Sequence, residues 1–235
     1  MAVRYNTYIP TDGLIFHVDA KNPKSYPGSG TTWYDLSKLK NNMELVNGPV
    51  YNSSGHITFD GSNDYAITHV SDFEPAFDVA NFTTIVWFRP ISLPNSPRYI
   101  FAHGESFDTD KSKFGMHSNS SQVFQSWFEA QDDADYFIGT ASLSTNNWYQ
   151  GATTYDASTN AWRIYLNGVV TDTATPAQDP ASIDHALTLG CRTNQGGIYQ
   201  SFFNGDISVA KYYNKVLSDA EILQSFNAFR GRYGI

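Results

Sequence analysis

Short runs of alternating apolar and polar residues, separated by turn-forming residues, recur along most of the chain. Residues 14–19 show the pattern clearly, with Leu14, Phe16 and Val18 on one face and the residues between them on the other. A period of two places successive side chains on opposite faces of an extended segment, which is typical of a β-strand. We therefore expect a chain built mainly from short strands.

The same pattern predicts a central strand and two hairpins. Residues 82–88 are almost wholly apolar, so both faces of this strand should be covered. Asn167-Gly168 between two alternating segments favours a two-residue hairpin, because both turn positions need positive φ. We also predict a hairpin that joins residues 57–59 to 65–68 around a turn at 60–64. Further strands are expected at residues 98–102, 114–117, 123–129, 136–138, 148–155, 187–191 and 207–213.

Only the end of the chain has a helical pattern. Ser218 followed by Glu221 forms a capping box, and Ile222, Phe226 and Phe229 recur at helical spacing. The fold class we predict is all-β, an antiparallel two-sheet jelly-roll sandwich with one short C-terminal helix. In this prediction residues 1–11 form an N-terminal arm and residues 12–235 a single domain.

Charge and composition exclude several classes of partner. The net charge is −8, with 23 acidic residues against 15 Lys and Arg that do not cluster, so we expect neither nucleic acid nor membrane as a partner. Residues 1–10 contain no apolar run of signal-peptide length, which predicts synthesis in the cytoplasm without secretion by a signal peptide. The single cysteine, Cys191, is expected to be a small buried side chain.

Three segments in a fixed order carry a family resemblance. They read GLIFHVDA at 13–20 with WYDLS at 33–37, then FDGSNDY at 59–65, then FNGDI at 203–207 followed by YYNKVLS at 212–218. Together they resemble the concanavalin A-like, laminin-G-like jelly-roll family and bracket most of the chain. The resemblance implies a lectin-like sandwich.

The closing stretch, residues 226–234, is similar to versions of this domain in tailed bacteriophages, where they occur in capsid decorations and in tail or head fibres. The resemblance implies a virion structural protein, a capsid decoration or fibre-associated protein at the virion surface. Its partners would then be other virion proteins, capsid or tail, and further copies of itself in a homo-oligomer. The N-terminal arm would dock on a neighbouring subunit.

The resemblance makes calcium the one cofactor to consider. Many relatives carry an aspartate after the isoleucine of the Gly-x-Ile motif, where this chain has Ser208, so the inherited site is in doubt. Asp60 and Asp64 are the metal candidates by analogy, although aspartate is also a turn former. Asp108, Asp110 and Ser112, and the run Asp132, Asp133 and Asp135, are other acidic groups that a solvated loop explains equally well.

Glucanases on this fold use a Glu-x-Asp-x-x-Glu strand, and none of the glutamates here has that context. On that ground we predict that the chain is not an enzyme. The alternative to the virion role is a carbohydrate-binding module that recognises host or environmental glycans. Its candidate ligand-binding residues are Trp127, Tyr136 and Tyr199, for which core packing is the competing interpretation.

Overall fold

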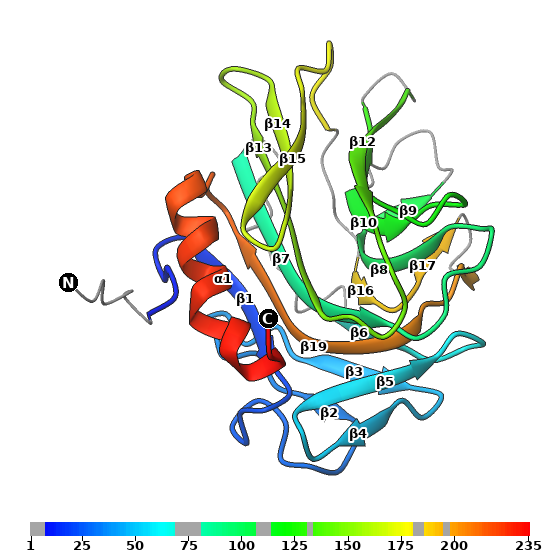
Figure 1. Ribbon diagram of the computed structural model, residues 1–235. Helices are drawn as coiled ribbons and strands as arrows, with labels where there is room; N and C mark the ends of the chain where they lie inside the picture. The colour runs from blue at the N-terminus through cyan, green and yellow to red at the C-terminus, as the bar shows by residue number, and fades with distance from the viewer. Residues whose placement is uncertain (1–7, 69–80, 107–113, 131–133, 181–185, 195–197) are drawn as a thin grey trace.

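The computed structural model describes residues 8–68, 81–106, 114–130, 134–180, 186–194 and 198–235. These residues form two antiparallel sheets that face each other and one C-terminal helix (Figure 1). The predicted all-β sandwich with a single terminal helix is thereby confirmed. Of the predicted arm, residues 1–7 lie outside the described part, so its docking role stays a prediction.

The first sheet, sheet A, contains both ends of the fold. Strand β19 (Asn204–Tyr213) lies near its middle. It pairs with β7 (Asn81–Pro90) along one edge and with β5 (His56–Asp60) and β1 (Leu14–Asp19) along the other. The order in the described residues is β15 (Val169–Ala174), β14 (Ala161–Leu166), β13 (Tyr149–Asp156), β7 (Asn81–Pro90), β19 (Asn204–Tyr213), β5 (His56–Asp60) and β4 (Val50–Asn52), with β1 (Leu14–Asp19) beside β19.

The second sheet, sheet B, is built from strands between residues 32 and 189. Its order is β12 (Asp135–Ser142), β11 (Val123–Glu129), β10 (Phe114–Ser118), β8 (Arg98–His103), β16 (Leu187–Leu189), β6 (Tyr65–Thr68), β3 (Met43–Val46) and β2 (Thr32–Trp33). A small third sheet, sheet C, adds β18 (Ile198–Gln200), β17 (Arg192–Asn194) and β9 (Glu105–Ser106).

Aromatic side chains from both sheets fill the space between them. Phe82 of β7 meets Phe114 of β10 with ring centroids 4.6 Å apart, and Phe88 meets Phe124 at 5.4 Å. These residues are completely buried, as is Trp33 on β2. Burial of such large apolar side chains is the main stabilising contribution to the sandwich.

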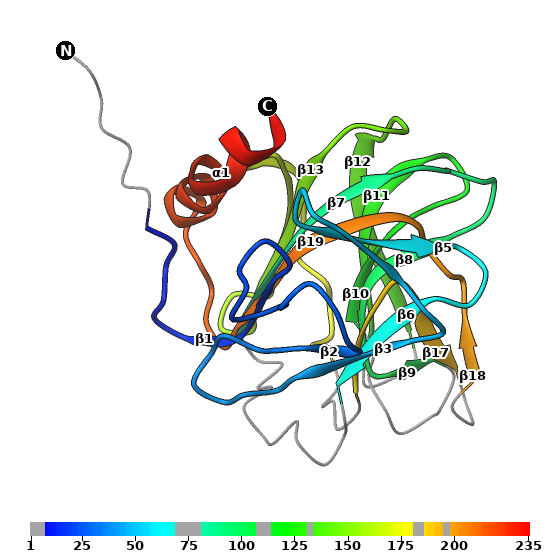
Figure 2. The ribbon, with the colours of Figure 1, turned by 90° about the horizontal axis from the view of Figure 1, so that it is seen from below.

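Helix α1 (Asp219–Tyr233) covers the outer face of sheet A, on the side away from β8 and β10 (Figure 2). Phe226 stacks on Trp87 of β7 with centroids 5.7 Å apart and planes at 4°. The predicted capping box at Ser218 and Glu221 is present. Because the helix buries the outer side of β7, the prediction that this strand is covered on both faces is confirmed. No described helix has the length and apolar character needed to cross a membrane.

One of the two predicted hairpins is wrong. β5 pairs with β19 and β4 in sheet A, whereas β6 pairs with β3 and β16 in sheet B, so the turn at 60–64 passes from one sheet to the other. The other hairpin, β14–β15, is confirmed, with φ of 54° at Asn167 and 80° at Gly168. Cys191 is fully buried, as expected, and burial raises the pKa of its thiol.

Candidate ligand-binding face

Four neighbouring strands of sheet B place aromatic rings on its outer side. Tyr99 comes from β8, His117 from β10, Trp127 from β11 and Phe137 from β12. Tyr99 and Trp127 pack together with Ala102 in a cluster separate from the core between the sheets, while Phe114 and Met116, on either side of Gly115, belong to that core. We call Tyr99, His117, Trp127 and Phe137 the aromatic face.

The rings of the aromatic face are in mutual contact. Tyr99 stacks on His117 with centroids 5.0 Å apart and planes at 20°. Trp127 meets Tyr99 edge-on at 5.8 Å and 89°, and Phe137 meets His117 edge-on at 6.1 Å and 81°. Phe137 is 51% exposed, whereas the other three are nearly buried. The cluster therefore reaches solvent through Phe137.

A glycine makes the position of the indole possible. A Cβ on Gly115 would lie 2.7 Å from the carbonyl oxygen of Phe101 and 3.0 Å from Nε1 of Trp127. Any other residue would collide with the backbone of β8 and press on the indole. The sequence thus supplies the one residue type that lets the indole of Trp127 approach β10 this closely.

A guanidinium from sheet C borders the aromatic face. The Cζ of Arg192 lies 5.0 Å from the centroid of the Tyr99 ring, and its Nη1 donates to the Tyr99 hydroxyl at 3.3 Å. The side-chain carbonyl of Gln200 accepts from Arg192 Nη2 at 3.1 Å when its amide is oriented to face the guanidinium. Arg192 is thus held over Tyr99 by a cation–π contact and by hydrogen bonds.

Burial keeps the titratable rings of this face neutral. It lowers the pKa of His117 to about 3, and the positive charge of Arg192 acts in the same direction. Burial also raises the pKa of the Tyr99 hydroxyl. At physiological pH the face therefore presents an uncharged imidazole and phenol beside one permanent cation.

Two polar atoms of the aromatic face have no hydrogen-bond partner among the residues that the structure describes. They are Nε1 of Trp127 and Nδ1 of His117, on side chains that are 4% and 2% exposed. A buried polar atom left unsatisfied costs about 1–3 kcal/mol, so native proteins seldom keep two together. The face can therefore offer a ligand one donor, the indole N–H, and one group that accepts or donates according to its tautomer.

The three predicted ligand-binding residues do not come together. Trp127 belongs to the aromatic face. Tyr136 is one residue from Phe137 on β12 but packs on the core side, stacked on Phe128 at 5.3 Å. Tyr199 lies on β18 and stacks on Tyr65 at 4.3 Å. Sequence reasoning missed Tyr99 and His117. Alternation with the core residues Phe114 and Met116 places His117 on the outer side, whereas Tyr99 is two positions from the core residue Phe101 and reaches the outer side only where the pairing of β8 with β10 shifts register.

The two predicted metal ligands serve the turn that joins the sheets. The exposed Asp60 carboxylate accepts from the backbone N–H of Ser62 at 2.7 Å and of Asn63 at 3.2 Å, and the first of these bonds is the main reason that its pKa is lowered. Asp64 is buried, which raises its pKa, and it accepts from the N–H of Asp60. Within the described residues no three His, Cys, Asp or Glu side chains are grouped to hold a metal ion. Asp108, Asp110, Ser112, Asp132 and Asp133 lie outside those residues.

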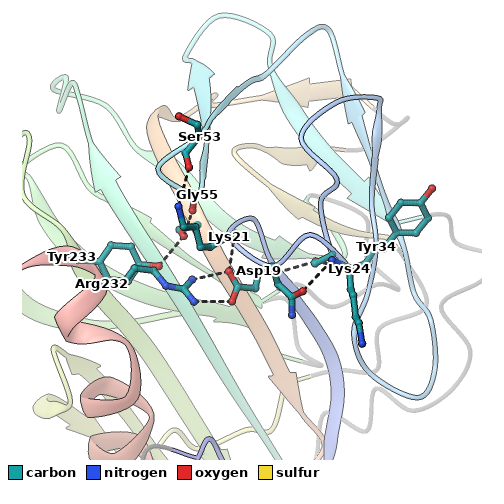
Figure 3. Close-up of polar contacts among 11 residues, drawn as sticks. Asp19, Lys21, Lys24, Tyr34, Ser53, Gly55, Arg232 and Tyr233 are labelled. Atoms are coloured by element: carbon teal, nitrogen blue, oxygen red, sulfur yellow. Dashed lines mark hydrogen bonds and ion pairs between the residues drawn. The ribbon is translucent and has the colours of Figure 1, made fainter.

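At the position where relatives carry aspartate, Ser208 is committed to protein contacts. Its hydroxyl donates to the carbonyl of Gly55 at 2.5 Å and accepts from the Tyr233 hydroxyl at 2.8 Å. Next to it, Arg232 donates to both carboxylate oxygens of Asp19, at 2.7 and 3.1 Å (Figure 3). The guanidinium at the end of α1 thus neutralises the buried carboxylate at the end of β1, which fixes the helix on sheet A.

A second buried ion pair lies on the outer side of sheet A. Arg89 donates to Asp206 at 2.6 Å, and Thr58 donates to the other carboxylate oxygen at 2.6 Å. Burial lowers the pKa of the neighbouring His56, whose Nε2 is 3.6 Å from Asp206. The indole of Trp148 lies between Tyr233, at 4.5 Å, and the guanidinium of Arg89, at 5.4 Å. Because protein groups already contact Trp148, we assign this cluster a packing role.

Comparison with known proteins identifies the family to which the fold belongs. The family model of the concanavalin A-like lectin/glucanases superfamily matches residues 60–223, which is more than half of the chain. No curated protein matches the sequence. The structure is similar to a sialidase of Trypanosoma rangeli in complex with 2,3-difluorosialic acid, with a TM-score of 0.70, 17% identity and 95% of this chain covered. It is also similar to the binding domain of botulinum neurotoxin serotype D, with a TM-score of 0.68, 13% identity and 92% of this chain covered.

The chain spans about a third of the length of the sialidases it matches, and 34% of the one in complex with 2,3-difluorosialic acid. It spans 52% of the length of the matched neurotoxin chain. At these identities the likeness concerns the fold alone. It nevertheless corrects our prediction that the chain is not an enzyme. That prediction depended on one missing glucanase motif, whereas the fold is shared with sialidases, including a mutant displaying trans-sialidase activity. The fold therefore also occurs in enzymes other than glucanases, so the absence of the glucanase motif is no argument against enzymatic activity.

Proposed function

Since the chain belongs to the concanavalin A-like lectin/glucanases superfamily, we propose that it binds carbohydrate at the aromatic face of sheet B. The observation that carries the proposal is the contact cluster of Tyr99, His117 and Trp127, which opens to solvent at Phe137. Two of the structures to which the fold is similar support it, because one holds a sialic acid derivative and the other is a toxin binding domain.

The chemistry of the face suits a sugar. A pyranose ring has apolar C–H faces that pack on aromatic rings, and its edge carries groups that hydrogen-bond. Phe137 supplies exposed apolar surface, and Trp127 Nε1 and His117 Nδ1 supply polar atoms without a partner in the described residues. Arg192, fixed over Tyr99, adds donors at the border.

A glycan array, probed with and without calcium, tests this proposal. We expect binding to a defined set of glycans, and titration calorimetry with the best of them should give a weaker affinity for Phe137→Ala by a factor of about 10. Tyr34→Ala is the matched control, because Tyr34 is another exposed aromatic residue, at 44%, outside the face. Absence of binding across the array, in both conditions, would reject the proposal.

We further propose that the chain displays this face on a virion, as a capsid decoration or fibre-associated protein that contacts capsid or tail proteins and further copies of itself. The support is the phage-like stretch at 226–234, which forms the second half of α1 and its end. Mass spectrometry of purified particles should detect the chain, and deletion of residues 1–11 should reduce its incorporation. Particles that lack the protein would contradict this role.

A further inference from the structure

The hydrogen-bonding atoms of the aromatic face restrict the kind of sugar that fits. The indole Nε1 of Trp127 can only donate, and the neutral imidazole of His117 can accept at Nδ1 when its proton is at Nε2. Neither atom has a partner in the described part of the chain, and both side chains touch the ring of Tyr99. A complementary ligand needs an acceptor for the indole and a donor for the imidazole.

The surroundings of these atoms are apolar. Tyr99, Trp127 and Ala102 form one buried cluster, and the phenyl ring of Phe137 lies next to it. An ammonium would lose its water here beside the cation of Arg192, and a carboxylate would meet a guanidinium that already donates to the Tyr99 hydroxyl. The group that enters should therefore be neutral and should carry an apolar end.

A secondary amide that ends in a methyl group meets these conditions. Its carbonyl oxygen accepts from Trp127 Nε1, its N–H points the opposite way and donates to His117 Nδ1, and its methyl packs against Ala102 and Tyr99. Resting on the carbohydrate-binding function proposed above, we propose that the face selects sugars that carry an acetamido group, that is, N-acetylated hexosamines. A plain hydroxyl would satisfy the polar atoms but would bring no methyl group to the apolar side chains of Ala102 and Tyr99.

Phe137 is the residue that must move to admit this group. It is the Cα partner of Trp127 in the β11–β12 pairing, and its ring reaches across β11 to His117. It is also 51% exposed, so its ring can turn outward, where it remains available to pack against the sugar ring that carries the acetamido group. The three rings beneath it are held by their own contacts, so they would keep their places when it rotates.

The test compares sugars that differ only in the acetamido group. N-acetylglucosamine, N-acetylgalactosamine and N-acetylmannosamine, with their β-linked trisaccharides where these exist, are titrated beside the parent hexoses by calorimetry. We expect at least one acetylated sugar to bind about 10-fold or more tightly than its parent. Trp127→Phe should abolish that difference, because it keeps an aromatic ring and removes the N–H. Trp148→Phe, at a position just before β13 and outside the aromatic face, should preserve it.

Each result is decisive. Equal affinity for the two members of every pair, or a preference for the parent hexose, overturns the acetamido assignment and leaves carbohydrate binding intact. A preference for the acetylated sugar that survives Trp127→Phe also overturns it. Absence of binding by both members of every pair, and by the glycan array, rejects the proposed function and this inference with it.

Discussion

The indole of Trp127 meets the ring of Tyr99 edge-on, with centroids 5.8 Å apart and planes at 89°. The two residues lie on strands that do not pair with each other, because β10 runs between β8 and β11. Gly115 on β10 has no side chain, which leaves room for the two rings to meet over that strand. The aromatic face thus depends on a contact that spans three strands, and a side chain at position 115 on the middle strand would prevent this contact.

Substitution of Gly115 by alanine should destabilise the protein. The new Cβ would lie 2.7 Å from the backbone oxygen of Phe101, and overpacking of this kind costs about 1–3 kcal/mol. Urea unfolding measures the loss. Gly231→Ala is the control, since Gly231 is exposed within α1 with nothing within 4 Å of its Cβ position, and a gain of up to about 1 kcal/mol is expected. Equal stability of the two variants would refute the crowding at β10.

The Asp19–Arg232 pair should contribute far more stability than an exposed pair. Its side chains are 7% and 27% exposed, so Arg232→Gln leaves a buried carboxylate without its cation and should cost about 2 kcal/mol or more. Arg163→Gln breaks the exposed pair with Asp219, whose side chains are 45% and 60% exposed, and should cost less than about 1 kcal/mol. Thermal unfolding of both variants measures the two losses of stability. If Arg163→Gln lost as much stability as Arg232→Gln, the Asp19–Arg232 pair would not be the contact that fixes α1 on sheet A.

Lys211 should make stability depend on pH. It is completely buried under α1, with Nζ 3.2 Å from Ser225 Oγ and 4.3 Å from the centroid of the Phe229 ring, and Asp19 and Arg232 are the charges that act on it. Burial lowers its pKa from 10.5 to about 7. Between these values the unfolded chain binds more protons than the folded one, so the free energy of unfolding rises with pH from about 7 to 10.5.

Lys211→Met removes the buried amine and should flatten that rise. At pH 7 the variant should be more stable by about 1–2 kcal/mol, because an apolar side chain of similar length needs no desolvation. Chemical unfolding at pH 7 and pH 9 on both proteins measures the difference. Parallel pH profiles for the wild type and the variant would show that Lys211 does not titrate in this range.

Carbohydrate affinity should not change with pH over the range in which an ordinary histidine titrates. Burial holds the pKa of His117 near 3, so its ring stays neutral between about pH 5 and pH 8. Calorimetry with one bound glycan at the two ends of this range should give the same dissociation constant within a factor of about 2. A loss of affinity centred near pH 6.5 would show that the imidazole is accessible to protons and charged in the free protein.

Local sequence patterns predicted much of the fold, but they did not predict which strands far apart in the chain pair with each other. Residues 82–88 have no polar face, and the structure buries β7 under both the opposite sheet and α1. The segments around the turn at 60–64 looked like a hairpin because each alternates, yet β5 finds its partner at Asn204–Ile207, far along the chain. Alternation predicts that a segment is a strand but does not predict which strand it pairs with.

The same limit applies to the candidate site. Trp127 could be selected as an aromatic residue in a strand, but its contacts Tyr99 and His117 come from other strands, and a bulge between Met116 and His117 shifts the register of β8 and β10. Tyr136 was selected in place of Phe137, one residue away, because a tyrosine beside a turn is the more usual sugar platform. A one-residue choice moves a side chain to the opposite face of the sheet.

The most direct test of carbohydrate binding at the aromatic face is a titration followed by the indole N–H signals of the five tryptophans in a ¹H–¹⁵N spectrum. Addition of the best-binding glycan should shift the signal of Trp127 most, and leave those of the core residues Trp33 and Trp162 in place. A shift confined to Trp148, or saturable binding with no change at Trp127, would contradict the assignment of the site.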